Sequence, residues 1–362
     1  MKHLIEYFLE ELSDDKVKDI KKYVDNENFE IVLPKIIKAC KEADLIGEHF
    51  KTYFINKGLD NKSFDDNKEA ELGLRIGAYF AEDNKNQILK DIVKDNGVIT
   101  FDQLYKGNNI FKFCKKFQNV AKKISSIINV TSHHANVGQF EILLKFILKE
   151  NGAEHDHGDV SIKLGDKDFG LEVKGGYTLK GGAAICGQTT RSIKETSDEF
   201  CEILNISKPS KKGFMGSAKA NINIAQVLND NNITDIDKII DAYVKAFAYQ
   251  YQIDDKKQID DLIFALVEYN NKEKIFSIND NKVEIKSLTD ITGAVQLYFY
   301  NKKDKWNAIC AINQSTGDYS ILKEDELLDF NKVFNKVSFY YFEGNAQATG
   351  RRCISRIFPK YN

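Results

Sequence analysis

The chain has 362 residues, enough to bury a sizeable hydrophobic core and to form two domains. Its charge is high but balanced, with 52 Lys and Arg against 54 Asp and Glu and a net charge of −2. This balance excludes a uniformly basic protein that coats nucleic acid, and it leaves room for a local basic cleft.

Residues 1–128 are predicted to form a separate helical domain. Segments such as IVLPKIIKACKEADLI and IFKFCKKFQNVAKKISSII repeat apolar residues at steps of three and four, and Asn- and Asp-rich breaks separate them. Thr100 is a candidate N-cap of a short helix. DNA recognition and a role as a scaffold or docking platform both stay open for this domain, because no recognition helix rich in base-reading residues stands out.

Residues 137–150 (VGQFEILLKFILKE) are predicted to form an amphipathic helix, since apolar residues such as Val137, Phe140 and Leu144 recur at helical spacing. Glu141 lies one turn from Val137 and one from Leu144, on or beside the apolar stripe. A carboxylate there is costly unless it is paired or bound to a metal. The alternative is that Glu141 lies at the edge of the stripe and reaches water.

Residues 158–176 (GDVSIKLGDKDFGLEVKGG) are predicted to form a β-hairpin, because two runs alternate apolar and polar residues around a turn at 165–168. Side chains of a strand point to opposite faces in turn. Asp159, Glu172 and Lys174 therefore share the face that points away from the apolar side. Two carboxylates suit Mg²⁺, and a lysine can offset charge on a phosphate. The alternative is a solvated polar strand face.

The order of Asp159, a hairpin and Glu172-Val173-Lys174 resembles the PD-(D/E)XK nuclease superfamily, whose core is an Asp, a hairpin and then Glu/Asp-x-Lys. Gly158 stands where these proteins usually have a proline. The ordered set of a helical G-x-x-E ending at Glu141, then G-D, E-V-K and a glycine-rich segment is similar to phage-encoded members.

The resemblance implies a restriction-endonuclease-like fold and Mg²⁺-dependent hydrolysis of phosphodiester bonds in DNA, with Mn²⁺ as a substitute ion. Asp159 and Glu172 would bind the ion, the backbone carbonyl of Val173 would be a further ligand, and Glu141 would join directly or through water. Lys174 would position the attacking water and stabilise the developing negative charge.

Residues 189–204 are predicted to form the next helix. Gln188 precedes it, and some branches of the superfamily carry a glutamine there that places substrate or water. Thr189 or Thr190 could equally be the N-cap, which would leave Gln188 in a loop. Arg191 would project from the first turn toward a bound phosphate, or it is simply exposed.

Residues 207–219 are predicted to form a loop, because they contain Pro, Ser and Gly. Lys208, Lys211 and Lys212 give this loop a positive charge that could clamp a DNA backbone without reading its sequence. A solvated loop explains the same residues.

The remaining chain changes from helical to strand periodicity. Helices are predicted at 236–251 and 259–269, and a hairpin is predicted around Asn279-Asp280-Asn281. Further strands are expected at WNAICAI, DYSIL and VSFYYFEG, either in the nuclease sheet or in a small α+β lobe. The last residues hold Arg351, Arg352 and Arg356, which form a basic strand edge facing DNA or a basic tail without a role.

The 6 cysteines show no C-x-x-C spacing, which argues against a zinc ribbon. The first residues lack the apolar core of a secretory signal, and no run is long enough to span a membrane. We therefore expect a cytoplasmic protein without membrane partners, in a bacterium or a phage-infected host cell.

These observations predict an α/β protein with a helical domain at 1–128 and a nuclease domain at 129–362, in which helices flank a mixed sheet. The predicted function is that of a Mg²⁺-dependent DNA endonuclease, and a homodimer is left open. The alternative is a catalytically idle DNA-binding or phage assembly protein that kept the fold. An intact acid pair with its lysine speaks against such decay.

Overall fold

The computed structural model describes residues 99–113, 139–150, 158–178, 183–184, 191–210, 213–216, 219–341 and 355–360. The chain divides into two compact units. The first unit comprises Met1–Ile99 and Lys116–Ala153, and the second comprises Thr100–Lys115 and Glu154–Asn362. This division differs from the expected single border after residue 128. Most of the predicted helical domain lies outside the described residues.

The described part of the first unit contains helix α8 (Gln139–Ile147), within the helix predicted from the apolar stripe. Phe140, Leu144 and Ile147 of this helix are buried. The backbone of Ile99 donates to the carbonyl of Ile147 at 2.9 Å and accepts from Lys149 at 2.9 Å. Residue 99 is thereby held at the C-terminal end of α8.

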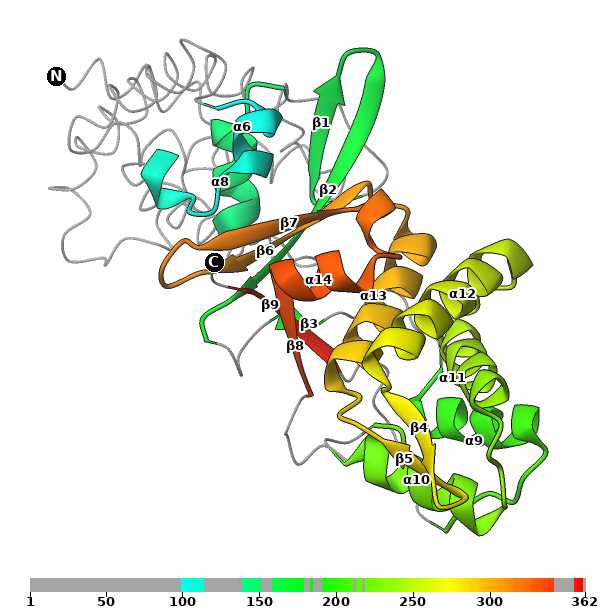
Figure 1. The fold of residues 1–362 in the computed structure, drawn as a ribbon. Helices are drawn as coiled ribbons and strands as arrows, with labels where there is room; N and C mark the ends of the chain where they lie inside the picture. Colours follow the sequence, from blue (N-terminus) through cyan, green and yellow to red (C-terminus); the bar gives the residue numbers. More distant parts are fainter. Residues whose placement is uncertain are drawn as a thin grey trace, which may run out of the picture. The chain divides into compact units, whose positions relative to one another are not determined.

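The second unit is built around a mixed four-stranded sheet in the order β1-β2-β6-β7 (Figure 1). Strands β1 (Val160–Leu164) and β2 (Lys167–Gly176) form the predicted antiparallel hairpin. The turn begins at Gly165, whose φ of 64° is a conformation that glycine adopts at little cost. Strand β6 (Ala308–Asn313) runs parallel to β2, and β7 (Tyr319–Lys323) is antiparallel to β6.

A long helical crossover separates β2 from its parallel partner β6. Its helices are α9 (Ile193–Leu204), α10 (Ala220–Asp230), α11 (Ile236–Tyr251), α12 (Lys256–Glu273) and α13 (Thr289–Asp304). Helix α11 packs against α9, α12 and α13, which form one group in Figure 1. The apolar stripe of α11 explains this position, because nine of its residues belong to the shared hydrophobic core.

Two smaller sheets complete the second unit. Strands β4 (Phe276–Asn279) and β5 (Lys282–Ile285) form the predicted hairpin, and both of its turn residues, Asp280 and Asn281, have positive φ. The other sheet has the order β3-β9-β8 and consists of β3 (Ala183–Ala184), β9 (Ser355–Pro359) and β8 (Val337–Tyr341). The expected strands at the end of the chain are therefore divided between the main sheet and a separate one.

Short helices close the second unit. They are α6 (Phe101–Lys106), the 3₁₀-helix η2 (Glu324–Glu326) and α14 (Phe330–Lys336). Thr100 is the N-cap of α6, as predicted, and it forms a reciprocal capping pair with Gln103. The Phe101 ring packs on Phe169 of β2 with 4.8 Å between the ring centroids. Helix α6 thus covers the apolar face of the hairpin.

The structure differs from the sequence-based predictions at two helices. The N-cap of α9 is Ser192 rather than Thr189 or Thr190, because its hydroxyl accepts from the backbone N–H of Glu195. Helix α13 was not predicted at all, and its residues from Ile291 to Asn301 are all buried. A helix that is buried on every side has no apolar stripe to reveal it.

Candidate functional site

The hairpin brings Asp159 to the segment that contains Glu172 and Lys174. Val160 pairs with Leu171, so the same register places Asp159 opposite Glu172. Oδ2 of Asp159 accepts a hydrogen bond of 2.8 Å from the backbone N–H of Val173. This bond fixes the Asp159 carboxylate beside the Glu-Val-Lys segment at the end of β1.

The Glu172 side chain is buried and contacts Tyr300 of α13, which corrects the expectation that it points away from the core. Glu172 is 7% exposed, and its Oε1 accepts hydrogen bonds from Nζ of Lys174 and the hydroxyl of Tyr300. The Lys174 ammonium also lies 5.4 Å from the centroid of the Tyr300 ring. These donors offset the cost of burying a carboxylate, which is large for an unpaired charge.

The two carboxylate oxygens of Glu172 differ in the hydrogen bonds that they accept. Both donors use Oε1, and within the described residues no hydrogen bond reaches Oε2. Glu172 therefore has one oxygen that is engaged by protein donors and one that can take a ligand.

The carbonyl of Val173 faces the same edge as Asp159. The N–H and C=O of one strand residue point to the same side, and the next residue points to the other. Gly170 directs both groups toward β6, since its carbonyl accepts from the backbone N–H of Asn307 at 2.8 Å. Val173 has the opposite direction, and its N–H reaches Asp159. Its carbonyl oxygen therefore lies on the Asp159 side.

Tyr300 completes this cluster, and sequence analysis missed it. Burial raises the pKa of its hydroxyl far above the ordinary value, and the charges of Glu172 and Asp159 raise it further. Tyr300 therefore stays protonated and can act only as a donor to Glu172 at neutral pH. It lies 128 residues from Glu172 in a helix without periodicity, so the sequence carried no signal for it.

The glycines after Lys174 have a local packing role. A Cβ at Gly175 would meet the side-chain amide of Gln314, in the turn after β6. The backbone N–H of Gln314 also donates to the carbonyl of Gly176 at 2.7 Å. The β6–β7 turn thus lies close against these glycines.

Glu141 and Gln188 are the two other predicted catalytic residues. Glu141 belongs to the first unit, and its carboxylate lies 3.7 Å from Nζ of Lys145, one turn later in α8. This pairing reduces the cost of a carboxylate near the apolar stripe. Gln188 lies outside the described residues.

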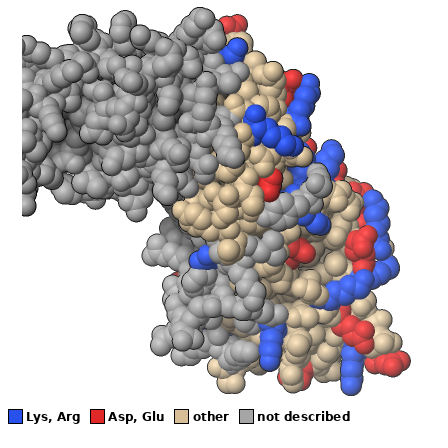
Figure 2. Space-filling model, turned by 90° about the vertical axis from the view of Figure 1, so that its left-hand side faces the viewer, with Lys and Arg blue, Asp and Glu red and all other residues tan. Residues whose placement is uncertain are grey.

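The predicted DNA-binding residues are spread over different environments. The Arg191 guanidinium lies 3.5 Å from the Tyr249 ring centroid and donates to the Tyr249 carbonyl at 2.7 Å. Lys208 pairs with Glu202 at 2.6 Å. Arg356 lies in the central strand of its sheet, not at an edge. Lys211, Lys212, Arg351 and Arg352 are outside the described residues. Lys and Arg alternate with Asp and Glu over the described part of the face in Figure 2.

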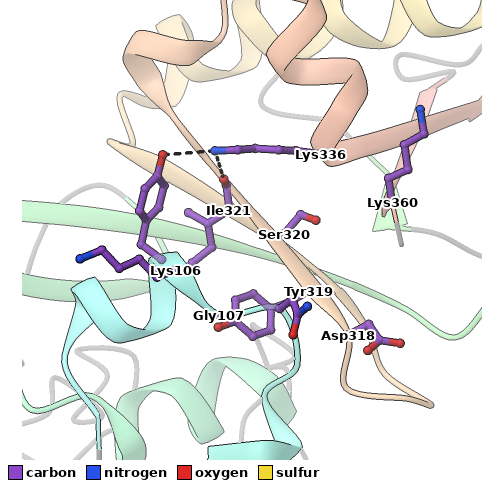
Figure 3. A pocket seen from close by; sticks show the side chains of 10 residues that line it. Lys106, Gly107, Asp318, Tyr319, Ser320, Ile321, Lys336 and Lys360 are labelled. Atoms are coloured by element: carbon purple, nitrogen blue, oxygen red, sulfur yellow. Dashed lines mark hydrogen bonds between the residues drawn. The ribbon is translucent and has the colours of Figure 1, made fainter. Parts of the chain in front are cut away.

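A second polar cluster lies around Glu326. Its carboxylate accepts from Lys336 at 2.8 Å, from the hydroxyl of Tyr105 at 3.0 Å and from the backbone N–H of Lys323 at 2.9 Å. Burial would raise the pKa of Glu326, but these donors outweigh burial and hold it below its usual value. The cluster borders a cavity of about 260 Å³. Figure 3 shows Lys336 directed toward the carbonyl of Ile321. The Lys336 ammonium also donates to the hydroxyl of Tyr105 at 3.2 Å.

The lysines that line the cavity all have partners in the protein. Lys106 pairs with Asp102 at 2.7 Å, Lys336 pairs with Glu326, and Lys360 donates to the carbonyl of Phe334 at 2.8 Å. Because these ammonium groups are held by the protein, the cavity does not by itself identify a ligand.

The chain matches no family model, no curated protein and no solved structure. Within the described ranges, no group of three or more His, Cys, Asp and Glu side chains is placed to hold a metal ion. None of the helices in the described part is long and apolar enough to cross a membrane. The hairpin groups themselves are therefore the basis for assigning a chemistry.

Proposed function

We propose that the second unit is a Mg²⁺-dependent DNA endonuclease of the PD-(D/E)XK type. The observation that supports this proposal is the meeting of Asp159, Glu172 and Lys174 at the end of one hairpin, with Asp159 bonded to Val173. The order and types of these residues match the resemblance found in the sequence.

The oxygen groups of the hairpin fit a magnesium ion. Mg²⁺ prefers oxygen ligands and commonly uses one or two carboxylates, with water completing its octahedron. Asp159, Oε2 of Glu172 and the carbonyl of Val173 are groups of this kind. When bound, the ion would polarise a phosphodiester and activate water. The small number of carboxylates is compatible with this ion, because substrate oxygens and water fill the remaining positions.

Lys174 has an electrostatic role in this proposal. Its ion pair with Glu172 favours the charged ammonium. A charged lysine can hold a phosphate oxygen and stabilise the negative charge that develops during hydrolysis, but it cannot remove a proton from water. DNA is the substrate that the resemblance implies.

A catalytically idle DNA-binding or assembly protein is the second candidate. The observation that favours it is the pairing of Glu172 with both Lys174 and Tyr300, which satisfies the buried carboxylate without an ion. Such a protein could bind divalent cations and DNA and leave the DNA intact.

Plasmid cleavage by single variants tests the choice between these functions. Lys174→Ala and Asp159→Asn are expected to lower the rate of Mg²⁺-dependent cleavage by about 100-fold or more, because the first removes the cation that stabilises the phosphate charge and the second removes a charged ligand of the ion. Lys163→Ala and Asp166→Asn change exposed residues of the same hairpin and serve as matched controls. Full cleavage by Lys174→Ala or Asp159→Asn would refute the assignment.

A further inference from the structure

The hydroxyl of Tyr300 determines how the Glu172 carboxylate is used. Tyr300 is 4% exposed, and it donates to Oε1, the oxygen that also accepts from Lys174. Two donors on one oxygen hold the carboxylate in one orientation. Oε2 accepts neither of these two hydrogen bonds.

Tyr300 is held rigidly in this place. Its ring packs edge-on against Trp306 with 5.8 Å between the centroids, and Trp306 is fully buried. Asn301 donates to the carbonyl of Trp306 and closes the end of α13.

The end of α13 is also tied to the strand that carries Glu172. Asn307 follows Trp306 and accepts a hydrogen bond of 2.7 Å from the backbone N–H of Gly170 through its side chain. Its own N–H donates to the carbonyl of Gly170 at 2.8 Å. The helix end that carries Tyr300 is thus attached to β2 two residues before Glu172.

We propose that Tyr300 is a positioning residue, which turns Oε2 of Glu172 toward a divalent cation and keeps Lys174 on the other oxygen. Without the hydroxyl, the carboxylate can rotate and share both oxygens with Lys174, and the cation then competes with the ammonium. This inference rests on the proposed function, because it assigns Glu172 as a ligand. Residues that orient ligands in this way commonly change metal affinity by about 10–100-fold when they are replaced.

Mn²⁺ binding to the full chain tests the inference, measured by the loss of the free-ion electron paramagnetic resonance signal. Tyr300→Phe keeps the ring against Trp306 and removes only the hydroxyl, and we expect it to weaken Mn²⁺ binding about tenfold or more. Tyr298→Phe is the matched control, because Tyr298 is a buried tyrosine of the same helix that donates to Gln258 instead. Equal affinities of the two variants would overturn the inference.

A rescue variant separates the hydrogen bond from packing. Replacement of Tyr300 by para-aminophenylalanine keeps an N–H donor at the same ring position, and we expect its Mn²⁺ affinity to return to within about threefold of the wild type. In cleavage assays, Tyr300→Phe should raise the half-saturating Mg²⁺ concentration by the same factor as it raises the Mn²⁺ dissociation constant. The cleavage rate at saturating Mg²⁺ should change by a smaller factor. An amino variant as weak as Tyr300→Phe would contradict a positioning role.

Asp159→Asn distinguishes failure of the inference from failure of the proposed function. If the wild type binds Mn²⁺, Asp159→Asn abolishes binding and Tyr300→Phe does not weaken it, only the role of Tyr300 is wrong. If the wild type does not bind Mn²⁺, the proposed metal site and the role of Tyr300 are both wrong.

Discussion

At the scale of single residues, buried carboxylates in the second unit are stabilised by several donors at once. Glu172 is held by an ammonium and a phenol, and Glu326 by an ammonium, a phenol and a backbone N–H. For Glu326, these partners hold the pKa of the carboxyl below its usual value, although burial opposes this. The Glu326 cluster therefore links the stability of the second unit to pH.

Glu326→Gln is expected to lower the free energy of unfolding at pH 7 by about 2 kcal/mol, because it removes charged hydrogen bonds in a mostly buried place. The folded-state pKa of Glu326 lies below the unfolded value of about 4.3. The stabilisation is therefore complete above that pH and is lost as the pH falls through the folded-state pKa.

Urea unfolding at several pH values measures this difference. Glu324→Gln is the control, since Glu324 is more exposed in its pair with Lys302 and should contribute little. A difference between Glu326→Gln and the wild type that does not shrink in acid would contradict the account of this cluster.

At the scale of elements, helix α13 forms one wall of the candidate site and packs against β8. The two are close at Gly293, where an added Cβ would meet the ring and Cβ of Phe339. Glycine is therefore needed at this position for packing rather than for its backbone conformation.

Gly293→Ala tests this contact. Alanine is a better helix former by about 1 kcal/mol, but overpacking costs about 1–3 kcal/mol, and we expect a net loss of stability. In the background of Phe339→Ala, the same change should become neutral or stabilising. A loss of equal size in both backgrounds, measured by urea unfolding, would show that Phe339 is not the cause.

The elements differ in how far the sequence predicts them, for physical reasons. The hairpins β1–β2 and β4–β5 follow from local alternation and turn residues, and α11 follows from its stripe. The sequence also identified Asp159, Glu172 and Lys174, because their spacing is local. Helix α13 has no apolar stripe, so the sequence did not predict this helix or the role of Tyr300 within it. The contact of Tyr300 with Glu172 depends on a crossover that local patterns do not encode.

At the scale of the whole molecule, the second unit contains a segment from early in the chain. Residues Thr100–Lys115 belong to it, and Tyr319 donates from its hydroxyl to the carbonyl of Leu104 at 2.5 Å. Asn109 donates to the carboxylate of Asp318 at 2.7 Å. A division of the chain at one point along the sequence would separate these partners.

Phe101→Ala is expected to destabilise the second unit by about 3–4 kcal/mol, because it removes a buried ring from the hairpin. Trp306 is the single tryptophan of the chain and is fully buried, so its fluorescence reports unfolding of this unit. Phe264→Ala, at a side chain that is 64% exposed, is the control and should have little effect. An unchanged Trp306 transition in Phe101→Ala would place residue 101 outside the cooperative unit.

The most direct test of the central claim is incubation of the wild-type chain with supercoiled, linear, branched and single-stranded DNA. The account predicts cleavage of at least one of these DNAs with Mg²⁺ or Mn²⁺, and no cleavage after chelation of the ion or in Asp159→Asn. Intact DNA in every reaction, or cleavage that survives chelation, would contradict a metal-dependent nuclease.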